Sequence, residues 1–209
     1  IQPTLGLITN IGAAHEANFS SMEEKCAEKL QLFAHCETLV YCADNELIGA
    51  TLDKMGFAGK RITWSKQSKA AQYRFSTHIL SDCTEISFQR AEIAADGSYI
   101  FSQNQEKHQF FIPFTDEASI ENAIHAAVVA MQLGVSVAQL ATRMPQLQSV
   151  AMRLEVKPGV RGLTLIDDAY NADLTSLDIA LDSLHRRKEA HHKSVLVLSD
   201  FQQTGMPAG

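Results

Sequence analysis

The stretch PTLGLITNIG, residues 3–12, decides how this chain folds. The apolar run from Leu5 to Thr9 is typical of a buried strand, and the Asn10-Ile11-Gly12 sequence after it is typical of the loop at a strand's carboxyl end. Helices and strands then alternate, with helices predicted after Ser21 and over 45–55 and strands predicted over 38–42 and 61–64. This alternation predicts an α/β fold with a mostly parallel sheet.

The later part of the chain extends this fold. Residues 72–114 alternate or run apolar around an Asp96-Gly97 turn, which predicts an antiparallel addition to the sheet. Helices are predicted over 119–134 and in the short segment that ends at Pro145. After 145–151, which lacks strong periodicity and is the candidate linker, we predict a hairpin with a Pro158-Gly159 turn, a helix from 175 to about 185 and a strand over 194–200. The predicted domains are residues 1–148 and 149–209.

Composition excludes several classes of protein. The 209 residues are 45% hydrophobic and 20% charged, which is ordinary for a globular chain. A net charge of −6 argues against a nucleic-acid-binding surface, because phosphate contacts need clustered Lys and Arg. No apolar run approaches the roughly 20 residues that span a bilayer, and no signal peptide is evident. The four cysteines lack metal-ligand spacing, so we expect reduced thiols in a cytoplasmic protein without nucleic-acid or membrane partners.

A lysine falls on the expected buried face of the first helix. Ser21 followed by Glu24 is a capping-box pattern, which predicts a helix that begins near Met22. At about 100° per residue, Lys29 lies about 20° from Met22, on the same side as Cys26, Leu30 and Phe33. We therefore expect Lys29 to point inward. Such a cation is paired, deprotonated or chemically modified, or else its stem is buried and its ammonium group reaches water.

Two polar side chains share one side of the helix predicted over 119–134. Asn122 and His125 lie three residues apart, opposite Ile120 and Ile124. Asn122 is either a ligand contact or part of a solvated flank. For His125 we expect a place at the surface.

Polar clusters follow three predicted strands. In open α/β sheets, ligands bind outside the carboxyl ends of the strands. Clusters occur there at 10–15, 167–173 and 199–203. Arg153 and Asp168, at the two ends of the predicted hairpin, are candidates for a site or for a plain cross-strand ion pair.

Taken together, four motifs resemble the Mur ligase family, and most closely its MurF branch. The segment TNIGxAH ends at His15, and the lysine of EKLQLF, Lys29, follows fourteen residues later. The other three motifs, in family order, are ENAIHAA at 121–127, MRLE at 152–155 and LIDDAYNADLTSL at 165–177. The spelling FTDEASIENAIH at 114–125 is also similar to the subset of the branch that is fused to an alanine racemase.

The resemblance implies a fold and a reaction. Residues 1–148 would be the C-terminal part of the central ATP-binding domain, and 149–209 would begin a Rossmann-like C-terminal ligase domain. The implied enzyme is an ATP-dependent ligase of peptidoglycan precursor synthesis. It would add D-Ala-D-Ala to a UDP-MurNAc-peptide through an acyl phosphate.

The resemblance also implies roles for individual residues. His15 and a carbamylated Lys29 would hold Mg²⁺, although His15 is also open to the reading of a loop histidine satisfied by backbone groups. Asn122 would contact adenine. For the second domain, the implied roles are phosphate contact for Arg153, ribose contact for Asp168, and substrate and nucleotide contact for Tyr170 and Asn171.

One family feature is missing from the sequence. A phosphate loop of the form GxxxxGK[ST] is absent, and the nearest stretch, GFAGKR at 56–61, has the wrong spacing. We therefore expect an internal fragment of a longer ligase that is inactive by itself. The alternatives are another Mur ligase, a folylpolyglutamate synthase-like ligase, and a noncatalytic module that has lost the phosphate loop.

Overall fold

The computed structural model describes residues 3–12, 19–67, 70–102, 105–150, 153–170, 174–187 and 193–198. They cluster into two compact units, one containing 3–12 and 20–147 and the other containing Phe19 and the described residues from 148 onward. Each unit is described by itself.

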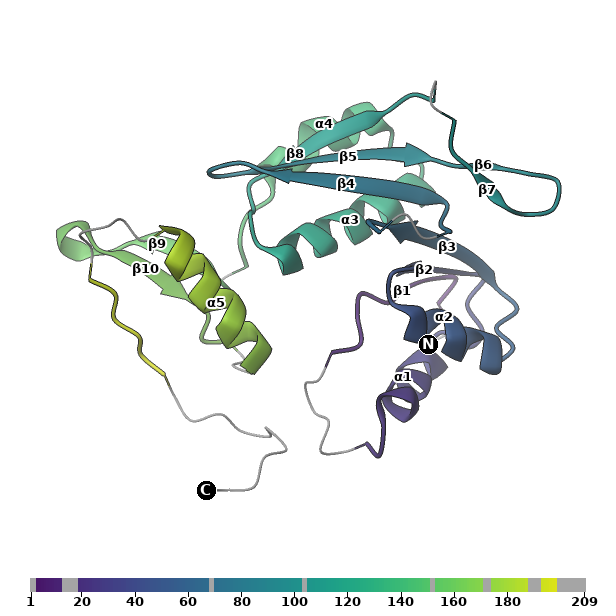
Figure 1. Ribbon diagram of the computed structural model, residues 1–209, viewed down its shortest axis with the longest axis horizontal. Helices are drawn as coiled ribbons and strands as arrows, with labels where there is room; N and C mark the ends of the chain where they lie inside the picture. The colour runs from purple at the N-terminus through teal and green to yellow at the C-terminus, as the bar shows by residue number, and fades with distance from the viewer. Residues whose placement is uncertain are drawn as a thin grey trace. The chain divides into compact units, whose positions relative to one another are not determined.

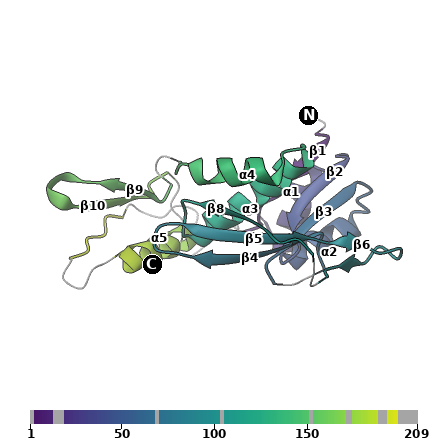
Figure 2. The same cartoon turned by 90° about the horizontal axis from the view of Figure 1, so that it is seen from above.

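A six-stranded sheet organises the first unit, and its arrangement can be followed in Figures 1 and 2. Its order is β1-β2-β3-β4-β5-β8, in which the first four strands pair in parallel and the last two are added antiparallel. The strands are β1 (Leu5–Leu7), β2 (Thr38–Cys42), β3 (Lys60–Ser65), β4 (Tyr73–Ile79), β5 (Thr84–Arg90) and β8 (His108–Ile112). The predicted α/β sheet with an antiparallel addition is confirmed, including a separate hairpin of β6 (Glu92–Ile93) and β7 (Tyr99–Ile100).

Four α-helices of the first unit accompany this sheet. Their bounds are α1 (Met22–Gln31), α2 (Glu46–Lys54), α3 (Glu117–Gln132) and α4 (Val137–Arg143). The Ser21 hydroxyl caps α1 by accepting a hydrogen bond from the backbone N–H of Glu24, at 3.1 Å. In the predicted capping box, the Glu24 carboxylate would accept a hydrogen bond from the backbone N–H of Ser21. It accepts instead from the backbone N–H of Ser20 at 2.8 Å, so this second bond of the box is made one residue earlier in the chain.

The side chains of β2 alternate between two apolar clusters. Leu39 and Tyr41 pack in the cluster formed with α1 and α2, whereas Val40 and Cys42 pack in the cluster formed with α3, α4 and the other strands. A strand that is covered on both faces reads as a continuous apolar run, which is the pattern of TLVYC. Because β1, β2 and β3 are parallel, their carboxyl ends lie along one edge of the sheet.

The described residues of the second unit contain a hairpin, the short 3-10 helix η3 (Val160–Gly162) in its turn, and one α-helix. Strands β9 (Glu155–Pro158) and β10 (Thr164–Asp167) pair antiparallel, as predicted, and α5 spans Leu174–Arg187. The strand predicted over 194–200 is wrong for its described part, because 193–198 has no regular structure. Val195 and Val197 are 82% and 88% exposed, and an apolar run becomes a strand only when a neighbouring strand accepts its hydrogen bonds. Residues 199–200 lie outside the described residues.

Within the part of the chain that the structure describes, every helix is too short or too polar to cross a bilayer. All four cysteines are free thiols, of which three are buried.

Candidate functional site

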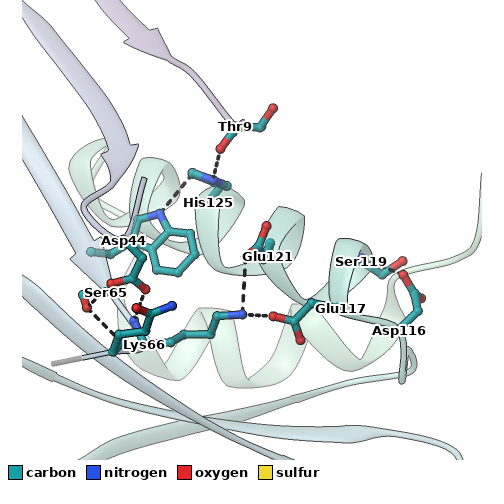
Figure 3. A network of polar contacts seen from close by, with 11 residues as sticks. Thr9, Asp44, Ser65, Lys66, Asp116, Glu117, Ser119, Glu121 and His125 are labelled. Carbon is teal, nitrogen blue, oxygen red and sulfur yellow. Dashed lines mark hydrogen bonds and ion pairs between the residues drawn. The ribbon is translucent and has the colours of Figure 1, made fainter. Parts of the chain in front are cut away.

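The carboxyl ends of β2 and β3 are joined by a short polar network. The Asp44 carboxylate, just after β2, accepts a hydrogen bond from the Ser65 hydroxyl at 2.6 Å and one from the backbone N–H of Lys66 at 2.8 Å. Both oxygens of this carboxylate are therefore engaged, one by the side chain that ends β3 and the other by the main chain that leaves it (Figure 3).

A polar stripe on α3 faces this edge of the sheet. Glu117, Glu121 and His125 are spaced by four residues, which places them on one side of the helix. The Lys66 ammonium forms ion pairs with the carboxylates of Glu117 and Glu121, the latter at 3.4 Å. Burial lowers the pKa of Lys66, but its bonds and charge interactions with the two glutamates outweigh burial, so that the pKa lies above its ordinary value.

His125 ends the stripe, and the expectation that it lies at the surface is wrong. The residue is 1% exposed. Its Nδ1 accepts a hydrogen bond from the indole N–H of Trp64 at 3.0 Å, and its Nε2 lies 3.1 Å from the carbonyl oxygen of Thr9. The surface expectation failed because α3 is covered over a wider arc than the stripe of isoleucines suggests, with Ala123 and Val128 also buried.

The partners of His125 fix its protonation state. Since Trp64 can only donate, Nδ1 must be unprotonated, and Nε2 then carries the hydrogen that is donated to Thr9. Burial lowers the pKa of His125 to about 4, although the bond to the Thr9 carbonyl opposes this shift. The imidazole is therefore neutral at pH 7.

Asn122 is exposed on α3, which agrees with both sequence interpretations, a ligand contact and a solvated flank. Its amide makes no hydrogen bond to another described residue, and it carries both donors and an acceptor. A base edge placed against α3 can therefore bond to it without displacing a protein partner.

Lys29 is exposed, so the expectation that it points inward is wrong. The buried lysine of α1 is Lys25, which is 2% exposed and whose ammonium donates a hydrogen bond to the carbonyl of Gly12 at 2.5 Å. On the helix, Lys25 is about 60° from Met22 and Lys29 about 20°, so angle alone favoured the wrong residue. The tertiary structure distinguishes the two lysines, because Lys25 is buried and bonds to the Gly12 carbonyl whereas Lys29 is exposed.

The donors expected for Mg²⁺ are not brought together by the described residues. His15 lies outside them, and among them no group of three or more His, Cys, Asp and Glu residues could hold a metal ion. Lys29 is exposed, so the apolar surroundings expected for its amine are not observed. The resemblance alone supports its carbamylation.

In the second unit, three predicted site residues lie close together. The Arg153 guanidinium lies over the ring of Tyr170, 4.6 Å from its centre, and the Asp168 carboxylate accepts a hydrogen bond from the backbone N–H of Leu154 at 2.9 Å. Leu154 has a φ of 47°, and this left-handed conformation is rare for a residue other than glycine. Arg153 and Asp168 form no ion pair with each other in the described part of the chain, so the plain cross-strand pair is not observed. Asn171 and the cluster at 199–203 lie outside the described residues.

Sequence reasoning missed most of the polar residues that join the elements of the first unit. The four-residue spacing of Glu117, Glu121 and His125 is a visible signal for a shared face. Nothing in the sequence signals that Trp64, sixty-one residues from His125, is its partner.

Known proteins are similar to this chain in sequence. Residues 1–130 match the family profile described as the Mur ligase middle domain. The UDP-N-acetylmuramoyl-tripeptide–D-alanyl-D-alanine ligase of Bacillus subtilis is 28% identical over 206 residues, which are 97% of this chain and 40% of the relative. The UDP-N-acetylmuramate–L-alanine ligase of a Synechococcus strain is 31% identical over 170 residues, which are 80% of this chain and 30% of the relative.

Solved structures share the fold. A crystal structure of MurF from Acinetobacter baumannii superposes with a TM-score of 0.71 at 20% identity, over 90% of this chain and 38% of that one. MurC from Thermotoga maritima gives a TM-score of 0.64 at 14% identity, over 88% of this chain and 39% of that one. This chain thus spans about 40% of the length of the curated D-alanyl-D-alanine ligase from Bacillus subtilis.

Proposed function

Since the chain belongs to the Mur ligase family, we propose that it is part of a MurF-type ligase that adds D-Ala-D-Ala to a UDP-MurNAc-peptide. The observation that carries this proposal is the match, over nearly the whole chain, to relatives that are named as D-alanyl-D-alanine ligases, at 28% identity for Bacillus subtilis and 25% for Escherichia coli. We assign 1–148 to the central ATP-binding domain and 149–209 to the start of the C-terminal ligase domain.

The proposed reaction has two steps. The γ-phosphoryl group of ATP is transferred to the terminal carboxylate of the UDP-linked muramoyl peptide, which gives ADP and an acyl phosphate. The amine of D-Ala-D-Ala then attacks the acyl carbon, an amide bond forms, and inorganic phosphate leaves. Neither step requires a nucleophile from the protein.

Residues of the second unit would orient the nucleotide. The Arg153 guanidinium is a planar fork of donors that suits phosphate oxygens, and its stacking on Tyr170 supports a fixed orientation for that fork. One oxygen of Asp168 is occupied by the Leu154 N–H, which leaves the other to accept from the ribose hydroxyls. Tyr170, which is 66% exposed as a residue, and Asn171 would contact substrate.

The first unit would supply the adenine contact and the metal ligands. The exposed amide of Asn122 is matched to a base edge, which both donates and accepts. Mg²⁺, which would offset negative charge at the phosphates, is assigned to His15 and a carbamylated Lys29 on the resemblance. We route no step through it, because the described residues do not assemble its ligands.

A ligation assay tests the proposal. A longer product of the same reading frame, one that includes a phosphate loop, is incubated with ATP and Mg²⁺ and one of two substrate pairs. The first pair is UDP-MurNAc-tripeptide with D-Ala-D-Ala, and the second is UDP-MurNAc with L-alanine. We expect phosphate release only with D-Ala-D-Ala and the tripeptide. Activity only with L-alanine would replace the proposal by the second candidate, which the 31% identity to an L-alanine ligase supports.

Variants of the same protein test the residue roles. Arg153→Ala and Asn122→Ala are expected to raise the KM for ATP by about tenfold or more, since each removes hydrogen bonds to a bound nucleotide. Arg186→Ala and Gln31→Ala are the matched controls, because both residues are exposed and lie outside the proposed site. A KM for ATP that is unchanged in both site variants would contradict these roles.

A further inference from the structure

Buried side chains of α3 and α1 contact the two ends of the segment Thr9–Gly12. At one end, Nε2 of His125 lies 3.1 Å from the carbonyl oxygen of Thr9, and at the other end the Lys25 ammonium donates to the carbonyl of Gly12. Both basic side chains are buried, at 1% and 2% exposure, whereas Thr9, Asn10 and Gly12 are exposed. Ile11, between the two ends, is buried in the cluster with α1 and α2.

Two buried polar side chains directed at main-chain carbonyls are costly unless their bonds are kept. Burial of an imidazole or an ammonium removes its hydration, and only a well-placed partner offsets that loss. In His125 both ring nitrogens are matched, because Trp64 fixes the tautomer that leaves Nε2 as the donor to Thr9. The arrangement therefore specifies one position for the Thr9 carbonyl.

We propose that His125 and Lys25 are positioning residues, which fix the segment Thr9–Gly12 against α3 and α1. The catalytic consequence rests on the proposed function. In that function α3 carries the adenine contact Asn122, three residues before His125. A single imidazole then sets the position of the segment Thr9–Gly12 relative to the helix that holds adenine.

The test of the tether uses this chain and NMR. We expect backbone ¹⁵N order parameters of about 0.85 for Asn10–Gly12 in the wild-type protein and below about 0.6 in His125→Leu. A smaller decrease is expected in Lys25→Met. His125→Gln is expected to restore wild-type values, because its amide can accept from Trp64 and donate to Thr9. Val128→Ala is the matched control, since it opens a cavity at a fully buried apolar residue of the same helix and removes no side-chain hydrogen bond.

The outcomes separate cleanly. Order parameters in His125→Leu that match those of Val128→Ala would overturn the tether. If His125→Leu does not fold, the tautomer of His125 in the wild-type protein tests the tether instead. The ¹⁵N chemical shifts of the imidazole ring should then show Nε2 protonated and Nδ1 unprotonated. The opposite tautomer leaves Thr9 without a donor and overturns the inference.

The catalytic consequence is measured in the ligation assay. His125→Leu is expected to raise the KM for ATP by about tenfold, with His125→Gln near wild type. An unchanged KM for ATP in an active ligase would overturn this consequence. A complete lack of D-Ala-D-Ala ligation by the wild-type enzyme would instead overturn the proposed function and leave the tether, measured by NMR, in place.

Discussion

The polar stripe of α3 and the hairpin of β9 and β10 both gather charged and polar side chains, but they treat them differently. On α3, Lys66 pairs with two glutamates and His125 has a partner for each nitrogen. On the hairpin, Arg153 is exposed over Tyr170 and one oxygen of Asp168 is free of described partners. Polar groups that are paired with other elements hold those elements together, whereas exposed groups with a free donor or acceptor remain available to a ligand.

The largest effect expected from this contrast is at Trp64. Its side chain is fully buried, packs edge-on against Phe75 at 5.9 Å between ring centres, and donates to His125. Trp64→Ala should lower the free energy of unfolding by about 3–5 kcal/mol, because it leaves a cavity and an unpaired nitrogen.

Urea denaturation measures this change, with Leu165→Ala on the hairpin as the counterpart. Leu165 is 53% exposed, so its loss should cost about 0.5 kcal/mol or less. Equal losses for the two variants would mean that the contrast between the regions is false.

The next effect is a pH dependence. The pKa of His125 is about 4 in the folded protein against an ordinary 6.5, so between these values the unfolded chain binds the additional proton. The contribution of a neutral His125 is complete above about pH 6.5 and is lost as the pH falls to about 4, at a cost of about 3 kcal/mol.

The measurement is the free energy of unfolding at several pH values for the wild type and for His125→Gln. Subtracting the two curves removes the contribution of the carboxylates to the pH dependence, because the carboxylates titrate in both proteins. The difference should decline on acidification, and a difference that stays flat from pH 7 to 4 would show that His125 is not buried in its neutral form.

A smaller effect is expected at Lys66. The side chain is 19% exposed and its glutamate partners are 61% and 33% exposed, so solvent screens the pairs in part. Lys66→Met keeps the apolar stem and should cost about 1 kcal/mol, with a dependence on salt that the wild type shows and the variant lacks. Thermal unfolding at low and high salt tests this, and Lys54→Met, which removes an exposed charge, serves as the control.

The smallest change in stability is expected at Arg153. Its stacking on Tyr170 is exposed, so Arg153→Ala should change the free energy of unfolding by about 0.5 kcal/mol or less. The proposed role in phosphate contact predicts instead a loss of nucleotide affinity. A large loss of stability would show that Arg153 has a structural role, and the contrast between the hairpin region and the stripe on α3 would then be false.

The sequence was a good guide wherever a residue's neighbours are local. The alternation of apolar runs predicted β1 to β3 with their helices, Ser21 predicted the start of α1, and the Pro158-Gly159 turn predicted the hairpin. It also placed Arg153, Asp168 and Tyr170 within one hairpin region, because they are brought together by a short chain reversal.

The sequence failed wherever a distant segment decides burial. On α1 it selected Lys29 as the inward lysine, although Lys25 is the buried one and bonds to the carbonyl of Gly12. On α3 it placed His125 at the surface, although Trp64 and Thr9 enclose it. The run at 194–198 lacked a neighbouring strand, which periodicity cannot supply.

By itself, then, the sequence determined the class of fold, the order of its elements and the motifs by which the family is recognised, since these depend on the periodicity and spacing of residues along one chain. The tertiary structure alone decided which lysine of α1 is buried and that His125 is a neutral bridge between Trp64 and Thr9. Burial and tautomer depend on atoms brought together from segments as far as 116 residues apart, and no local pattern encodes them.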